Sequence, residues 1–142
     1  MHKKFFAMIL TAMLAFSGMA LPVAAASDDA IIAGDNIMSV NTYTASSQLT
    51  VNGTSAVCTS TGRGAANTTT KITVLQVLEK QNAQGNWCSV ASWYKIANTY
   101  QITVVNTASN LASGNYRLKT TFTFYSDSSS EPVVKYSITK TV

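Results

Sequence analysis

Apolar and polar residues alternate over much of the chain, most clearly between Tyr116 and Tyr125. One set of positions is aromatic or aliphatic apart from a single threonine and comprises Tyr116, Leu118, Thr120, Phe122 and Phe124. The other set is basic, hydroxylated or tyrosine and comprises Arg117, Lys119, Thr121, Thr123 and Tyr125. A two-residue period is typical of a β-strand with one buried face. The pattern predicts a strand whose first set faces the core and whose second set faces solvent.

Shorter segments of strand-like composition surround this one, and turn residues separate them. Asn52-Gly53 predicts a hairpin between strands around 49–51 and 56–58. The segment 71–80, KITVLQVLEK, is apolar at both alternating sets of positions, so we predict a central strand covered on both sides. Further strands are expected at 87–96, at 100–105 and, after a turn at 126–132, around Val134, Tyr136 and Ile138.

No segment after Tyr43 sustains a helical period, so the predicted fold class is all-β. About seven strands in roughly 100 residues are typical of an antiparallel β-sandwich of immunoglobulin or fibronectin type III kind. Gly114-x-Tyr116, ahead of the sixth strand, matches a tyrosine corner, in which the hydroxyl bonds back to the preceding turn. We assign the sandwich to residues 43–142.

The first 26 residues have the zones of a secretory signal peptide. Lys3 and Lys4 precede an apolar run, and the small residues Ala24 and Ala26 suit a signal peptidase. We expect cleavage after Ala26 and a secreted, extracellular protein; an uncleaved membrane anchor is the alternative. Residues 27–42 show neither period and are predicted to be a flexible leader, or alternatively an extra edge strand docked on the domain.

Short motifs spread along the domain resemble those of a known family. They are Gly53-x-x-Ala56, Leu78-Glu79-Lys80, Gly85-x-Trp87-x-x-Val90-x-Ser92-Trp93, Gly114-x-Tyr116-Arg117-Leu118-Lys119 and Glu131-x-Val133. Together they are similar to a family of small secreted proteins from Gram-positive bacteria, catalogued as a domain of unknown function with a single immunoglobulin-like β domain. The resemblance covers residues 43–142. It implies secretion and a lone β domain, and it supplies no activity or binding residue.

Cys58 and Cys88 are the only cysteines. In a chain bound for an oxidising compartment, two cysteines are expected to pair, so we predict a disulfide between them. A structural zinc site needs four ligands, and the chain after Ala26 offers two thiols and no histidine. A catalytic thiol would likewise lack a histidine base. No metal site and no cofactor are predicted.

An enzyme is not expected. Acid–base catalysis near neutral pH relies chiefly on histidine or paired carboxylates. In the predicted domain the acidic residues are Glu79, Asp127 and Glu131, and the last two belong to one turn. No nucleophile-elbow or nucleotide-binding glycine motif occurs there.

Two groups of residues are candidate binding sites. Arg117, Lys119 and Tyr125, with Lys135 on the following strand, form a candidate anion-binding patch in a chain of net charge +4. Trp87, Trp93 and Tyr94 form a candidate carbohydrate-stacking platform. For the platform the alternative is that one tryptophan packs into the core. Trp87 and Trp93 share parity, so they lie on one face of the strand unless a bulge intervenes.

The favoured function is a secreted, non-enzymatic binding or interaction module of unknown ligand. Its partner is expected to be an anionic cell-envelope polymer or a secreted protein, with no nucleic acid and no membrane anchor in the mature chain. The alternative is a secreted antagonistic factor, a bacteriocin-like toxin or inhibitor, which would share the same size and export signal.

Overall fold

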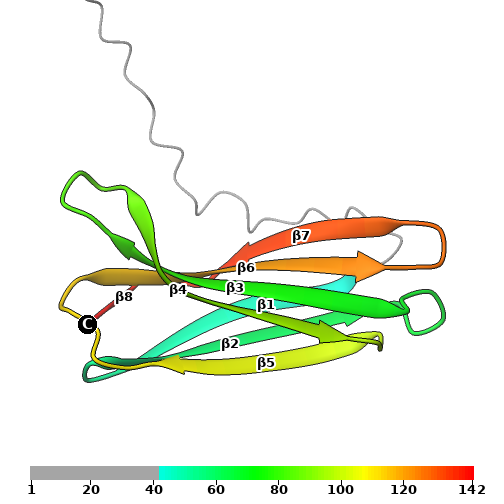
Figure 1. Cartoon of the computed structure of the whole chain (residues 1–142), viewed down its shortest axis with the longest axis horizontal. Helices are drawn as coiled ribbons and strands as arrows, with labels where there is room; N and C mark the ends of the chain where they lie inside the picture. Colours follow the sequence, from blue (N-terminus) through cyan, green and yellow to red (C-terminus); the bar gives the residue numbers. More distant parts are fainter. Residues whose placement is uncertain (1–41) are drawn as a thin grey trace, which may run out of the picture. The chain divides into compact units, whose positions relative to one another are not determined.

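The structure, a computed structural model, describes residues 42–142, which belong to one compact unit. These residues form strands and loops, with no helix among them (Figure 1). The strands are β1 (Thr42–Asn52), β2 (Ser55–Gly64), β3 (Lys71–Gln81), β4 (Trp87–Ala97), β5 (Gln101–Ala108), β6 (Asn115–Tyr125), β7 (Ser130–Tyr136) and β8 (Lys140–Thr141). The predicted signal peptide, residues 1–26, and all but the last residue of the predicted leader, residues 27–42, lie outside the described residues.

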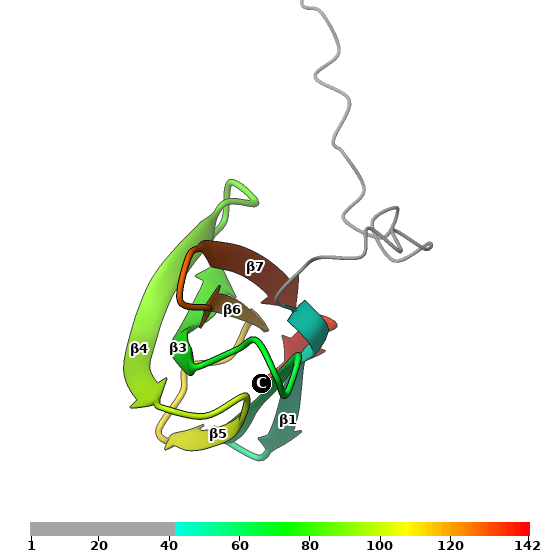
Figure 2. The same ribbon diagram turned by 90° about the vertical axis from the view of Figure 1, so that its right-hand side faces the viewer.

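The strands form two antiparallel sheets that pack face to face. One sheet has the order β1-β2-β5, and the other has the order β4-β3-β6-β7. The short strand β8 pairs with the first two residues of β6, ahead of the part of β6 that pairs with β7. Figure 2 shows the two layers of strands facing each other. The predicted all-β antiparallel sandwich is therefore confirmed, with the two-residue β8 added to seven longer strands. Because β4 pairs with β3 rather than β5, the fourth strand belongs to the sheet of β3, β6 and β7, whereas in an immunoglobulin constant domain the fourth strand joins the sheet of the first, second and fifth strands.

Two local predictions are confirmed in the turns. Asn52 pairs with Ser55 across the β1–β2 hairpin, and Gly53 there has a φ of 59°, a left-handed conformation that favours glycine. The hydroxyl of Tyr116 donates a hydrogen bond of 2.6 Å to the carbonyl of Ala112, which is the predicted tyrosine corner. This bond anchors the loop before β6 to the start of the strand.

The phase of β6 is also as predicted, because its even-numbered residues from Tyr116 to Phe124 are buried. Two other expectations about faces are wrong. β3 is central, but only its inward face is fully covered, since Leu75 on the other face is 38 % exposed. The candidate anion patch requires Lys135 to face outward with Arg117, but in the last long strand Val133, opposite Phe122, packs on the core, and Val134 and Tyr136 point outward instead. The strand begins at Ser130, earlier than predicted, and its alternation is offset by one residue.

The buried amide of Gln76 lies at the centre of the sandwich and bonds to both sheets. Its Nε2 donates to the Ser60 hydroxyl at 2.7 Å and to the carbonyls of Cys58 and Val104 at 3.3 Å. Its Oε1 accepts a bond of 2.7 Å from Nδ2 of Asn106. Gln76 is on β3, whereas these partners are on β2 and β5, so the amide joins the two layers.

Hydroxyl groups extend this network across the interior. Ser60 and Thr120 share a hydrogen bond of 2.7 Å, and Thr120 and Ser47 share one of 2.9 Å. Ser47 also donates to the Leu118 carbonyl. Gln76, Ser60 and Thr120 are fully buried, and a buried polar group is tolerated when its hydrogen bonds are made. The network therefore connects β1, β2, β3, β5 and β6 through hydrogen bonds, which require a defined orientation of donor and acceptor.

Apolar residues pack in two clusters. One comprises Leu49, Ala56, Cys58, Leu78, Tyr116 and Leu118. The other comprises Ile72, Val74, Val104, Phe122 and Phe124. On β3, Gln76 lies between Val74 and Leu78, and on β6, Thr120 lies between Leu118 and Phe122, so the polar network falls between the two clusters along the strands.

Gln76→Met is expected to destabilise the domain, because methionine keeps the volume but leaves Ser60 and Asn106 without the amide. The free energy of unfolding should fall by about 2 kcal/mol, measured by denaturant titration. Gln48→Met, at an exposed position of β1, is the matched control and should change it by less than about 0.5 kcal/mol. Equal effects of the two substitutions would contradict a structural role for the network.

Candidate functional site

The pairing register decides which side chains share the outward surface of the sheet β4-β3-β6-β7. Residues directly opposite in neighbouring strands point to the same face. Leu78 and Leu118 are opposite each other and buried, so the residues one position away point outward. We call this surface the outer face, and it carries Trp87, Tyr94 and Ile96 of β4, Leu75, Val77 and Glu79 of β3, Arg117, Lys119 and Thr121 of β6, and Val134 and Tyr136 of β7.

Large apolar side chains are exposed across the outer face. Their exposed fractions are 38 % for Leu75, 62 % for Tyr94, 51 % for Ile96, 45 % for Val134 and 44 % for Tyr136. Tyr94, Leu75, Thr121 and Val134 form one row across all four long strands. The exposed apolar residues are therefore spread over neighbouring strands of one surface.

The outward surface of the sheet β1-β2-β5 has a different composition. Its rows consist mainly of hydroxyl and amide side chains, with Gln48, Thr59 and the apolar Val105 in one row and Ser46, Thr61 and Thr103 in the next. Among the described residues, Val105 is the only large apolar side chain on this surface that is exposed. The apolar surface is thus confined to one of the two sheets.

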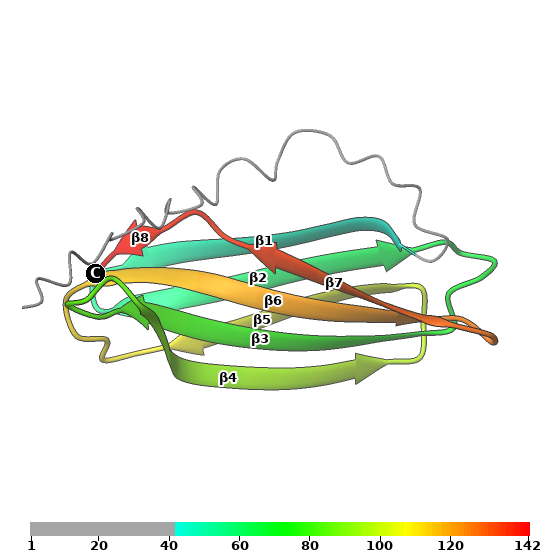
Figure 3. The same cartoon turned by 90° about the horizontal axis from the view of Figure 1, so that it is seen from above.

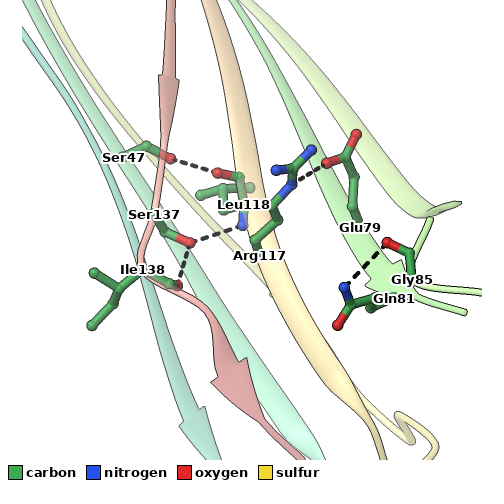
Figure 4. A network of polar contacts seen from close by, with 8 residues as sticks. All are labelled: Ser47, Glu79, Gln81, Gly85, Arg117, Leu118, Ser137 and Ile138. Atoms are coloured by element: carbon green, nitrogen blue, oxygen red, sulfur yellow. Dashed lines mark hydrogen bonds and ion pairs between the residues drawn. The ribbon is translucent and has the colours of Figure 1, made fainter. Parts of the chain in front are cut away.

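Arg117 lies near one end of the outer face and is held on three sides. Its Nε donates to Oε2 of Glu79 at 2.7 Å, in an ion pair whose side chains are 14 % and 12 % exposed (Figure 4). Its guanidinium lies 4.4 Å from the Trp87 ring centroid and 4.5 Å from that of Tyr136. An arginine between two aromatic rings gains cation–π attraction, and its paired position limits its rotamers.

A β-bulge separates the two tryptophans that share parity in the sequence. The β3–β4 register shifts between Leu78 and Glu79, so Ala91 and Ser89 oppose consecutive β3 residues. The extra residue reverses the phase of the strand. Trp87 consequently points to the outer face beside Arg117, whereas Trp93 pairs with Gln76 and packs against the core.

The predicted carbohydrate platform is accordingly divided. Trp93 is on the inward face, and Tyr94 is exposed on the outer face. Trp87 pairs with Gln81 and Tyr94 pairs with Leu75, so about 20 Å of strand separates them. The predicted residues are therefore not brought together, and Trp87 instead shares a group with Arg117 and Tyr136.

The residues of the predicted anion patch are also spread out. Arg117, Lys119 and Tyr125 share the outward face of β6, as expected. Arg117 is paired with Glu79, and Tyr125 lies at the other end of the strand, with the Lys71 ammonium 4.0 Å from its ring centroid. Lys135 pairs with Thr120, an inward-facing residue, so it does not join the outer face. Anion binding by these residues stays a prediction.

The predicted disulfide is wrong, because Cys58 and Cys88 are both free. Cys58 is fully buried in the core on β2, and Cys88 is exposed at the start of β4, in the other sheet. Figure 1 shows the β3–β4 hairpin projecting from the layers. A disulfide needs Cβ atoms about 4 Å apart, which an inward core position and a projecting edge position do not provide. Burial raises the pKa of the Cys58 thiol to about 11.

The described residues carry three side-chain carboxylates and two thiols. Of their three carboxylates, Glu79 is paired with Arg117, and Asp127 and Glu131 belong to the β6–β7 hairpin. Residues 42–142 contain no group of three metal-ligating side chains. In the same part of the chain, no helix has the length and apolarity to cross a membrane.

A pocket of about 340 Å³ lies on one side of the sandwich, between β4 and β5. Its lining consists of Trp93, Tyr94 and Lys95 from β4 and residues 103–106 from β5. Seen from above, β4 runs along one long side of the domain and β1 along the other (Figure 3). The pocket thus lies where the end strands of the two sheets meet.

Sequence reasoning identified neither this pocket nor the outer face as a unit. The signal for the outer face was present, because Leu75 and Val77 are apolar at outward positions of β3. A second protein layer and a binding partner require the same apolar residues, so the pattern alone does not distinguish internal burial from an exposed binding surface. The pocket depends on the packing of two strands from different sheets and has no local signal.

Comparison with known proteins identifies no relative. No protein-family model, no curated protein and no solved structure matches this chain.

Thiol labelling should distinguish the two cysteines. We expect one thiol per chain, that of Cys88, to react with an aromatic disulfide reagent in the native protein, and two after unfolding without reductant. Cys88→Ser should show no native reaction and one thiol after unfolding. If neither cysteine reacts in the unfolded, unreduced protein, the two thiols are not free and the predicted disulfide is supported.

The raised pKa of Cys58 should make the protein less stable in alkali. The pKa of its thiol is near 9 in the unfolded chain and about 11 in the folded one. The contribution of this group to the free energy of unfolding is therefore complete below pH 9 and is lost as pH rises through 11. The loss should reach about 3 kcal/mol. The measurement is the free energy of unfolding against pH, compared with Cys58→Ala, which shares every other titration. Parallel curves for the parent protein and Cys58→Ala would show that the loss of stability in alkali does not come from Cys58.

Proposed function

We propose that the protein is a secreted, non-enzymatic interaction module whose outer face binds a partner protein. The observation that carries the proposal is the set of exposed apolar residues on one sheet. Contiguous apolar surface is costly in water, and on soluble proteins it commonly marks an interaction site. The hydroxyl-rich surface of the other sheet, on the same domain, provides an internal comparison.

The composition of the outer face suits a protein partner. Tyrosine, tryptophan and arginine contribute most to protein–protein binding energy, and Trp87, Arg117 and Tyr136 form one group there. Arg117 is already held by Glu79 and the two rings. A side chain ordered before binding loses less entropy in the complex. We therefore infer that this group is the anchor of the interface.

The same geometry favours a protein over an anionic envelope polymer. A polyanion binds through several accessible cations, whereas among the outer-face residues named above Arg117 is paired with a carboxylate and Lys119 is the one other cation. Lys135 belongs to the opposite face of β7. Apolar contacts should therefore supply most of the affinity, and binding should depend weakly on salt. No observation favours the antagonistic factor over the interaction module.

The double substitution Ile96→Ser/Tyr136→Ser should remove partner capture. Immobilised protein would be exposed to culture medium and envelope extract of the source cells at low and high salt. The captured partner would then be titrated against each variant by calorimetry. We expect an affinity loss of at least tenfold, because two exposed apolar contacts are removed.

Val57→Ser is the control, because it removes an outward apolar side chain from β2, the middle strand of the other sheet. It should leave capture unchanged, and the stability of all variants should be checked by thermal unfolding. Capture that survives the double substitution would contradict the proposed surface. Capture lost at high salt alone would favour the anionic polymer, and growth inhibition by the purified protein would favour the antagonistic factor.

A further inference from the structure

The strand β5 ends its sheet, and half of its backbone groups point away from the sheet. Among the described strands β5 pairs in a ladder with β2 alone. The amide of Gly64 donates to the carbonyl of Tyr100 at 2.7 Å, which defines these two as a hydrogen-bonded pair. Such pairs recur every second residue in an antiparallel ladder. The N–H and C=O groups of residues 101, 103, 105 and 107 therefore point toward the open side.

The β5 edge lacks the features that normally block strand addition. Its sequence, QITVVNTA, contains no charge, no proline and no glycine. Natural sheets protect their edges with charged residues, proline, bulges or very short strands, because an open edge pairs readily with another chain. Both end strands of this sheet have uncharged sequences, β1 with TYTASSQLTVN and β5 with QITVVNTA, but of these two only β5 adjoins the pocket between the sheets.

The opposite end of the other sheet shows such protection. β7 contains Glu131, Pro132 and Lys135. The amide of Ser137 donates to the Leu118 carbonyl, and the same alternation places the Pro132 nitrogen on the free side of β7. Proline there removes an outward N–H without breaking the ladder. The domain therefore blocks the β7 edge and leaves the β5 edge open.

The pocket beside β5 adds side-chain recognition to this edge. Trp93 and Val104 contribute apolar surface, and Asn106, whose amide bonds to Gln76, contributes a polar group. Lys95 is exposed at the pocket and makes no ion pair within residues 42–142. Neither β4 nor β5 carries an acidic residue. A carboxylate for Lys95 therefore has to come from an occupant.

We propose that the β5 edge binds an extended peptide segment of a partner protein as an added antiparallel strand. Its backbone pairs with residues 101–107, one side chain enters the pocket and an acidic side chain meets Lys95. This is the β-augmentation mode of peptide recognition, in which backbone bonds give affinity and pockets give selectivity. A second copy of the chain fits less well, because its β5 edge offers no carboxylate. The site is separate from the outer-face anchor at Arg117.

Selection from a displayed library of random linear peptides against the full purified protein tests the proposal. We expect enriched sequences to alternate β-branched residues and to carry an aspartate or glutamate. The selected peptide, labelled with a fluorophore, would then be titrated by anisotropy. Failure to enrich any common sequence would overturn the proposal.

Val105→Pro is the decisive variant, because it removes one outward N–H and leaves the bonds to β2 intact. It should weaken peptide binding at least tenfold, whereas Val105→Ala, which keeps the N–H and removes only exposed methyl groups, should change it by no more than about threefold. Circular dichroism and thermal unfolding would verify that Val105→Pro folds. Equal binding by the two variants would overturn the added strand.

Lys95→Glu tests the charge without altering the backbone. It should weaken the acidic peptide at least tenfold and restore affinity for a peptide with lysine in place of the acid. Unchanged preference would overturn the proposed contact with Lys95. If the parent protein dimerises and Val105→Pro abolishes the dimer, the occupant of the β5 edge is a second copy of the chain, and the proposed peptide is overturned. Tyr136→Ser should not affect peptide binding, so failure of this proposal is separable from failure at the outer face.

Discussion

The buried amide of Gln76 imposes the constraint on which the surfaces of this domain depend. Apolar side chains tolerate small shifts between packed sheets, but a buried amide needs its donors and acceptors at defined positions. Gln76 finds them on β2 and β5, and Ser60 passes the connection to Thr120 on β6. A strand displaced by one residue would turn its polar member of the network to solvent and break these bonds. The network thus specifies which residues of each strand face outward.

Both proposed surfaces follow from that specification. With Gln76 and Thr120 inward, Leu75 and Thr121 point outward in one row, and Glu79 meets Arg117 on the same face. The ladder between β2 and β5 likewise determines which backbone groups of β5 are left open. One surface offers side chains and the other offers backbone, so the domain presents two chemically different ways of holding a partner.

Features coded by adjacent residues were predictable from the sequence. Alternation fixed the phase of β6, Asn52-Gly53 located a hairpin, and Gly114-x-Tyr116 located the tyrosine corner. Features that depend on distant partners were not. Val133 and Val134 are both apolar, so the phase of β7 is decided only by its pairing with β6. The bulge that separates Trp87 from Trp93 arises from the β3–β4 register, and the disulfide was inferred from an expected compartment rather than from geometry. Family membership and secretion stay predictions.

The polar network also affects how the chain reaches its native state. The β1–β2 and β3–β4 hairpins join neighbouring segments and can form within microseconds, whereas the ladders β2–β5 and β3–β6 join distant ones and form more slowly. In the interval, each early hairpin exposes its future interior to water. Ser60 and Gln76 make the middle of those surfaces hydrophilic, and interrupting an apolar strand with a polar residue lowers its tendency to aggregate. The side chains that align the finished sheets therefore also keep the unfinished ones soluble.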